Sequence, residues 1–320
     1  PPTHRPHDEE TAWVGDRPTY AAKHRRNPLF IDIHTHTIML NDPRQYEVIC
    51  RWTNPEQLLS MLDDLGIEKG VILPLVHHEI GEILQTNENA LDIYNKYPDR
   101  IIPFCNFDVR YWYNSSKTDY TKALNHYKEL GCKGVGEFVS NVPWDDDRVL
   151  NFLEHVEASG LPILFHVASA NRGMYGLVDE LGLPKLEFVL QKFPKLNFIG
   201  HSMAFWSAIS GNVDETDWMG YPSRPVTEGG RLPELLRKYD NLWGDISAGS
   251  GNNALVRDWD FGCKFMEEFQ DRLLFGTDIC QCPQEVGQVD TLNNALAQHK
   301  LSHGAYEKIS HLNAEQLLGL

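Results

Sequence analysis

Two histidines one residue apart, His34 and His36, end the apolar run "LFIDIHTH". Side chains two positions apart on a β-strand point to the same face, so both imidazoles should aim at one place. Other apolar runs of the chain also end in a polar residue, namely Glu137, His166, His201 and Asp278. Imidazoles and carboxylates together suit zinc or a neighbouring divalent cation, which lowers the pKa of a bound water to about 7. The pattern therefore predicts a metal centre that activates water or polarises a substrate.

These residues must be positioned by eight short apolar runs, at residues 29–36, 69–76, 100–108, 133–139, 162–169, 196–203, 241–248 and 272–279. Amphipathic helical patterns lie between the runs, and the pattern at 55–66 begins with Pro and ends with Gly as helices do. Strands alternating with helices indicate an α/β fold, either a (β/α)8 barrel or an open sheet. The polar residues at the strand ends favour the barrel, whose functional residues collect at that face. We expect residues 1–27 to form an N-terminal arm and residues 28–320 a single barrel domain.

The sequence resembles the amidohydrolase superfamily from about residue 29 to the end. Beside the His-x-His pair, the segments "LPILFHVAS", "KFPKLNFIGHSM", "NLWGDISA", "LLFGTD" and "NAEQLLGL" are similar to the amidohydrolase-related (amidohydrolase 2) branch. That branch contains amino-carboxymuconate-semialdehyde decarboxylase, resorcylate-type decarboxylases and lactone hydrolases. The motifs are specific for the superfamily and say little about the reaction.

The resemblance implies roles for the strand-end residues. It assigns the ligands of one divalent metal ion, most often Zn²⁺ with Mn²⁺ or another first-row metal as alternatives, to His34, His36, His166 and Asp278. His201 matches a histidine that acts on the substrate. Glu137 corresponds in position to a carboxylate that bridges two metal ions in other members, so a two-metal centre is the alternative.

Three reactions follow from this resemblance. The leading hypothesis is hydrolysis of a small amide, lactone or ester, in which Asp278 moves the proton of the metal-activated water and His201 stabilises the oxyanion or protonates the leaving atom. The alternative is a metal-dependent, non-oxidative decarboxylase, a lyase acting on a small carboxylic acid. A TatD-like metal-dependent nuclease is the third hypothesis.

The composition argues against some partners. The formal net charge is −16 and the pI about 5.3, which disfavours nucleic acids and anionic membranes. No apolar run approaches the ~20 residues that span a bilayer. The six cysteines are irregularly spaced, as expected of free thiols in a reducing compartment, so we expect a cytoplasmic enzyme with a small-molecule substrate. A homodimer is compatible with the resemblance.

A second group of residues follows the strands at the same expected end of the barrel. Aromatic and charged side chains there could wall an apolar pocket or pair with a substrate carboxylate. We regard as candidate substrate contacts His77, His78, Arg110, Trp112, Arg172 and Trp206.

Overall fold

A computed structural model of the chain describes residues 29–40, 52–80, 84–169 and 175–320. The predicted arm, residues 1–27, and Arg172 lie outside these ranges. The strands are β1 (Ile31–Thr35), β2 (Lys69–Ile72), β3 (Ile101–Pro103), β4 (Val135–Phe138), β5 (Ile163–Ser169), β6 (Leu177–Asp179), β7 (Phe198–His201), β8 (Leu242–Asp245) and β9 (Leu273–Leu274).

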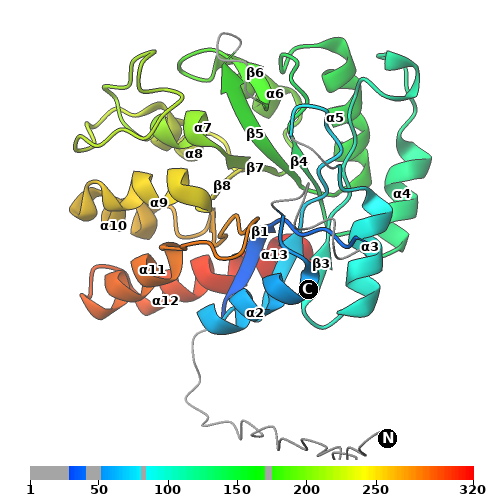
Figure 1. Ribbon diagram of the computed structural model, residues 1–320. Helices are drawn as coiled ribbons and strands as arrows, with labels where there is room; N and C mark the ends of the chain where they lie inside the picture. Colours follow the sequence, from blue (N-terminus) through cyan, green and yellow to red (C-terminus); the bar gives the residue numbers. More distant parts are fainter. Residues whose placement is uncertain (1–28, 41–51, 81–83, 170–174) are drawn as a thin grey trace, which may run out of the picture.

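The helices alternate with these strands along the chain and lie around them (Figure 1). They are α2 (Pro55–Leu65), α3 (Asn87–Lys96), α4 (Thr121–Glu129), α5 (Asp147–Ser159), α6 (Pro184–Lys192), α7 (Met203–Ser207), α8 (Arg231–Lys238), α9 (Ala248–Val256), α10 (Trp259–Glu268), α11 (Gln288–Ala297), α12 (His303–Glu307) and α13 (Asn313–Leu318). Short helical turns lie at Trp112–Asn114 and Lys308–Leu312. None of the helices in the described ranges is long and apolar enough to cross a membrane.

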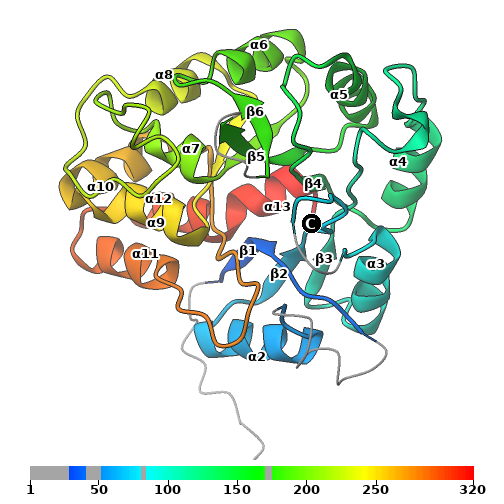
Figure 2. The ribbon, with the colours of Figure 1, turned by 45° about the horizontal axis from the view of Figure 1, so that its top comes forward.

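The strands form a closed parallel barrel. They pair in the orders β1-β2-β3 and β4-β5-β7-β8-β9, and β6 is an additional strand beside the carboxyl end of β5. Parallel bridges between Cys105 and Val135 and between Thr35 and Ile279 join the two sheets at their seams. The predicted (β/α)8 barrel is confirmed, and Figure 2 shows its strands surrounded by helices.

Local sequence signals explain where individual helices begin and end. Helix α2 starts at Asn54, whose side chain accepts a hydrogen bond from Gln57 N while the Gln57 side chain accepts one from Asn54 N. This reciprocal capping satisfies two backbone donors that a helix start leaves unpaired. The helix ends at Gly66, which adopts the left-handed conformation with φ 72°. The predicted helix at 55–66 is therefore confirmed.

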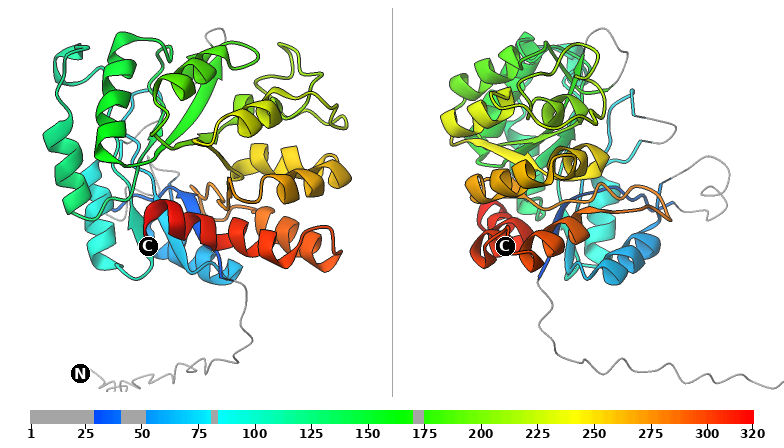
Figure 3. Two further views of the ribbon diagram at one scale, coloured as in Figure 1. Left: turned by 180° about the vertical axis from the view of Figure 1, so that it is seen from behind. Right: turned by 90° about the vertical axis from the view of Figure 1, so that its left-hand side faces the viewer.

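Two apolar layers hold the barrel together. One lies inside it and is made of residues in the strands or just beyond their ends, together with two residues of α13: Ile31, Ile33, Val71, Leu73, Ile102, Phe104, Leu164, Ile199, Trp243, Leu274, Ala314 and Leu318. The larger layer lies between the strands and the surrounding helices. Helix α13, next to the C-terminus in Figure 3, thus packs against the interior cluster at the end of the barrel away from the strand-end histidines.

Candidate metal centre

A polar layer lies directly above the apolar interior of the barrel. Side chains alternate along a strand, so the residue two positions beyond an interior apolar residue faces the interior again. On three strands that next residue is polar, and the pairs are Leu164 and His166, Ile199 and His201, and Trp243 and Asp245. His166 and His201 are also register partners on neighbouring strands. The strand register thus brings these side chains to one level.

On β1 a shift in register changes this alternation. Ile31 and Ile33 face the apolar interior, and the pairing with β2 is irregular between Asp32 and Thr35. Bulges of this kind re-aim side chains and are common beside functional sites. Beyond the shift, His34 and His36 both face the polar layer, while Thr35 lies in the wall and donates a hydrogen bond to the carbonyl of Val71.

His34 near the end of β1 and His36 just beyond it, called the β1 histidines below, present lone pairs to each other. His34 Nδ1 donates to Asp245 Oδ2 at 2.6 Å, and His36 Nδ1 donates to the carbonyl of Leu73 at 3.1 Å. Because these partners accept hydrogen bonds, the protons lie on Nδ1 and the neutral rings carry lone pairs on Nε2. The two Nε2 atoms lie 3.0 Å apart, with Glu137 Oε2 3.7 Å from His34 Nε2 and 3.5 Å from His36 Nε2. Such an arrangement needs positive charge between the atoms.

The surroundings of His34 also favour a positive charge at this position. Burial lowers the pKa of its imidazole, but the carboxylates of Asp278 and Asp245 outweigh burial and raise that pKa well above 6.5. The donor set, imidazoles with carboxylates, is the one that zinc and neighbouring divalent metals use. The residues therefore fit a divalent cation.

Glu137 connects the histidine pair of β1 with His166. Its Oε1 lies 2.9 Å from His166 Nδ1, while its Oε2 faces the β1 histidines. Burial raises the pKa of this carboxyl, but the hydrogen bond from His166 and the nearby imidazoles of His34 and His36 hold it well below its usual range. His166 Nε2 is buried and has no hydrogen-bond partner among the described residues. A buried polar atom without a partner is costly, and a bound cation would satisfy it.

Asp278 lies at the open side of the centre. Its Oδ1 is 3.5 Å from the Nε2 atoms of both His34 and His36, and its side chain is 27% exposed. Its backbone is left-handed, with φ 59°, and is held by a bond from Asp278 N to the carbonyl of His34 at 2.8 Å. Asp278 Oδ2 lies 4.0 Å from His201 Nε2. The structure thus brings together all six predicted strand-end residues, and their roles remain predictions.

Ligand atoms of these residues form three overlapping groups, each within 4.8 Å. The groups are His34, His36 and Glu137, then His34, His201 and Asp278, then Glu137, His166 and His201. The expected one-metal set of His34, His36, His166 and Asp278 is not among them, because Glu137 lies between His166 and the β1 pair.

Two buried aspartates behind the histidines were not anticipated from the sequence. Asp245 at the end of β8 bonds to His34 and lies 3.2 Å from His201 Nδ1. Asp32 accepts hydrogen bonds from Thr277 and from the backbone of His34, and burial raises the pKa of Asp32 to about 7. Asp245 could have been found, because it follows the interior Trp243 just as His166 follows Leu164.

A cavity of about 100 Å³ opens onto the centre. Its polar wall is formed by His36, Glu137, His201 and Asp278, and its apolar and aromatic wall by Trp52, Leu75, Ile80, Tyr175 and Cys280. The ring of Trp52 lies 5.6 Å from that of His36, and the ring of Tyr175 lies 4.6 Å from that of His166. These wall residues lie mostly beyond the ends of the strands, where no periodic pattern predicts them.

None of the five predicted substrate contacts that lie within the described ranges lines this cavity. The Arg110 guanidinium is paired with Asp108 and Glu79. Trp206 is buried behind β8 and donates its indole N–H to the Asp245 carbonyl.

The other three lie apart from the cavity as well. Trp112 stacks on Tyr120 and is 48% exposed. His77 is buried beside Phe138, and the exposed His78 lies against Tyr111. These three side chains thus pack against aromatic rings away from the cavity, and such contacts cannot be read from a position at a strand end.

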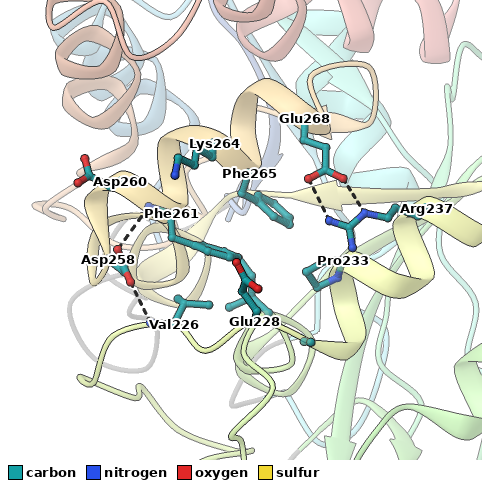
Figure 4. Close-up of a pocket in the computed structure, with 13 residues that line it drawn as sticks. Val226, Glu228, Pro233, Arg237, Asp258, Asp260, Phe261, Lys264, Phe265 and Glu268 are labelled. Atoms are coloured by element: carbon teal, nitrogen blue, oxygen red, sulfur yellow. Dashed lines mark hydrogen bonds and ion pairs between the residues drawn. The ribbon is translucent and has the colours of Figure 1, made fainter.

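A larger cavity, of about 580 Å³, lies away from the histidines, on the outer side of the barrel between α8 and α10 (Figure 4). Its lining combines Phe261, Phe265 and Pro233 with charged groups, and Arg237 and Glu268 pair across it. It contains none of the strand-end residues. Cavity size alone therefore does not mark the centre of this protein.

Comparison with known proteins agrees with the fold. The family model described as amidohydrolase matches residues 31–320. A search of curated protein sequences finds no match.

Solved structures share the architecture at low sequence identity. A probable 2-pyrone-4,6-dicarboxylic acid hydrolase from Acinetobacter baumannii is 16% identical, with TM-score 0.55 over 91% of this chain and 99% of its own. A 5-carboxyvanillate decarboxylase from Sphingomonas paucimobilis is 13% identical, with TM-score 0.55 over 92% and 100%. A dihydroxybenzoic acid decarboxylase from Polaromonas sp. JS666, with bound manganese, is 16% identical, with TM-score 0.54 over 92% and 98%. At these identities the likeness establishes the fold.

Proposed function

The chain belongs to the amidohydrolase family, which is metal-dependent, and we propose that it hydrolyses a small amide, lactone or ester. The observation that carries this proposal is the pair of carboxylates beside the β1 histidines. Glu137 Oε2 and Asp278 Oδ1 each lie 3.5 Å from His36 Nε2. One carboxylate can bind the cation while the other accepts a proton from the attacking water molecule.

A divalent cation held there would polarise the substrate carbonyl and lower the pKa of water to about 7. Asp278 is the partly exposed carboxylate, so it can accept a proton from the attacking water and pass it to the leaving oxygen or nitrogen. The water oxygen bonds to the carbonyl carbon, and the carbon–oxygen or carbon–nitrogen bond breaks. His201 faces the same cavity, and when it carries a proton on Nε2 as well as on Nδ1 it can donate a hydrogen bond to the developing oxyanion.

We take Zn²⁺ as the first candidate for the cation and Mn²⁺ as the second, with one ion per chain. Glu137 supports the alternative of two ions, because its two oxygens face different histidines. Elemental analysis of purified protein would distinguish the two cases. With two ions, Glu137→Gln should lose one equivalent and keep the other.

A second candidate, non-oxidative decarboxylation of a small aromatic acid, is favoured by the opposite wall of the cavity. Trp52, Leu75 and Tyr175 make this wall apolar and partly aromatic, as a flat ring would require. Two of the similar structures described above are decarboxylases of aromatic acids. In this reaction a proton would be delivered to the ring carbon as CO₂ leaves, from His201 or from Asp278 in its protonated form.

Isotopes in the solvent distinguish the two reactions. Metal-loaded protein is incubated with small lactones, esters, amides and hydroxybenzoates in H₂¹⁸O or D₂O, and products are identified by mass spectrometry. Hydrolysis places one ¹⁸O in the product carboxylate, whereas decarboxylation releases CO₂ and places one deuterium on carbon. For either reaction, Asp278→Asn should abolish turnover while part of the metal stays bound. Full activity of that variant would refute the role of Asp278.

A further inference from the structure

We propose that Asp245, with Ser247 beside it, is a positioning residue that holds both His34 and His201 with Nε2 directed into the cavity. One carboxylate would then link the cation site with the histidine that faces the substrate. The proposal builds on the function proposed above, because it concerns the same centre. It adds two residues that do not line the cavity and that act through other side chains.

Asp245 is placed for this role by the barrel itself. Its side chain is fully buried and lies behind the histidines. Its carbonyl accepts the indole N–H of Trp206 at 2.7 Å, and its Oδ1 accepts the backbone N–H of Ser247 at 2.9 Å. Gly276 leaves the necessary room, because a Cβ at that position would lie 2.6 Å from Asp245 Oδ1. The carboxylate is therefore held in one orientation.

The other oxygen, Oδ2, meets three polar groups. It lies 2.6 Å from His34 Nδ1, 2.7 Å from Ser247 Oγ and 3.2 Å from His201 Nδ1. Ser247 Oγ is in turn 2.9 Å from His201 Nδ1. A carboxylate accepts only, so the Ser247 hydroxyl donates to it and is left to accept the Nδ1–H of His201. A continuous hydrogen-bonded path thus runs from His201 through Ser247 to Asp245, where His34 also donates.

This path fixes the tautomers of both rings. With Nδ1–H engaged, each neutral imidazole carries its lone pair on Nε2. The rings lie with centroids 4.3 Å apart, and each Nε2 faces a carboxylate oxygen of Asp278. Without Asp245, each ring could place its proton on either nitrogen. A proton on His34 Nε2 blocks the cation, and one on His201 Nε2 removes its capacity to accept.

The network also makes distinct predictions for its two members. Asp245→Asn removes the charge that both rings share and should weaken cation binding, since changes to the partners of ligating histidines typically cost 10–100-fold in metal affinity. Ser247→Ala removes the hydroxyl between His201 and Asp245 and leaves His201 Nδ1 only the longer approach of 3.2 Å to Asp245 Oδ2, so it should leave cation affinity within about threefold of the parent on the same reasoning. Its effect should appear on His201 alone.

A matched control separates positioning from the general loss of a buried carboxylate. Asp179 is also buried and accepts backbone hydrogen bonds from Glu180, Lys185 and Leu186 at the start of α6, away from the centre. Asp179→Asn should reduce thermal stability and leave cation affinity and histidine tautomers as in the parent.

The experiment measures Zn²⁺ affinity of the full chain by competition with a chromophoric chelator, and records ¹⁵N spectra of histidine-labelled protein with and without Zn²⁺. We expect a 10–100-fold loss of affinity in Asp245→Asn, and a changed tautomer of His201 in both Asp245→Asn and Ser247→Ala. Unchanged tautomers in both variants, or an equal loss of affinity in Asp179→Asn, would overturn the proposal.

These readouts do not depend on turnover. If neither hydrolysis nor decarboxylation is found, the affinities and tautomers still test the network. If the parent protein binds no divalent cation, the proposed function fails, and the spectra of metal-free protein alone decide whether Asp245 and Ser247 set the tautomer of His201.

Discussion

His77 is a buried histidine that should make stability fall as the pH is lowered. It follows β2 and packs beside Phe138, with ring centroids 5.9 Å apart. Neither ring nitrogen has a hydrogen-bond partner among the described residues. Burial lowers the pKa of His77 from 6.5 to about 4, and the nearby Arg110 adds to this while the carboxylates of Asp108 and Glu79 oppose it. The native protein thus keeps this ring neutral where the unfolded chain protonates it.

The sign and size of the effect follow from this difference. Below pH 6.5 the unfolded state binds a proton that the native state does not, so stability is lost as the pH falls toward 4. At about 1.4 kcal/mol per pKa unit, the full effect is roughly 3 kcal/mol. Between pH 7 and pH 5 it amounts to about 2 kcal/mol.

The assay compares urea unfolding of the parent and of His77→Leu at pH 7 and pH 5. The free energy of unfolding of the parent should fall by about 2 kcal/mol more than that of the variant over this range, because titrations common to both proteins cancel. His303→Leu is the control for the loss of an imidazole from the surface, since the His303 side chain is 74% exposed. Equal pH dependence in the parent and in His77→Leu would show that the ring is not held neutral, and the reasoning would be refuted.

Three further predictions concern the fold and the centre. Gly262→Ala should destabilise the protein by about 2 kcal/mol or more in urea unfolding, since its Cβ would meet the backbone carbonyl of Leu255, whereas Gly304→Ala has open space and should be neutral or slightly stabilising. Asn54→Ala removes the side-chain cap of α2 and should lower the free energy of unfolding by about 1 kcal/mol. Gln57→Ala should lower it by less, and a larger loss in Gln57→Ala than in Asn54→Ala would contradict the prediction. Removal of divalent metal by a chelator should lower the melting temperature, and Zn²⁺ at 100 times its dissociation constant should restore about 2.7 kcal/mol; an unchanged melting temperature would argue against a cation site.

The barrel and its polar layer could be predicted because both follow from strand periodicity. Each apolar run ends where the barrel opens, so a polar residue at that point must join the others. This places His166, His201 and Asp278 at one level without knowledge of any contact. The last run was expected to be strand over 272–279, but β9 covers only Leu273–Leu274. The left-handed backbone of Asp278, which turns the chain toward β1, belongs to the part that follows the strand.

The walls of the cavity could not be predicted, because they depend on contacts between loops of different strands. Arg110 shows the difficulty: its type and place suggest a substrate carboxylate, but Asp108 and Glu79 already hold it. Trp206 follows a strand, as a residue that contacts substrate would, but its side chain lies behind β8 and donates a hydrogen bond to the Asp245 carbonyl. The alternation of side chains along the strands, which predicts the ligands, also predicts that Asp245 faces the centre. In a barrel of this kind, the residues that orient a centre are therefore easier to read from sequence than the residues that select its substrate.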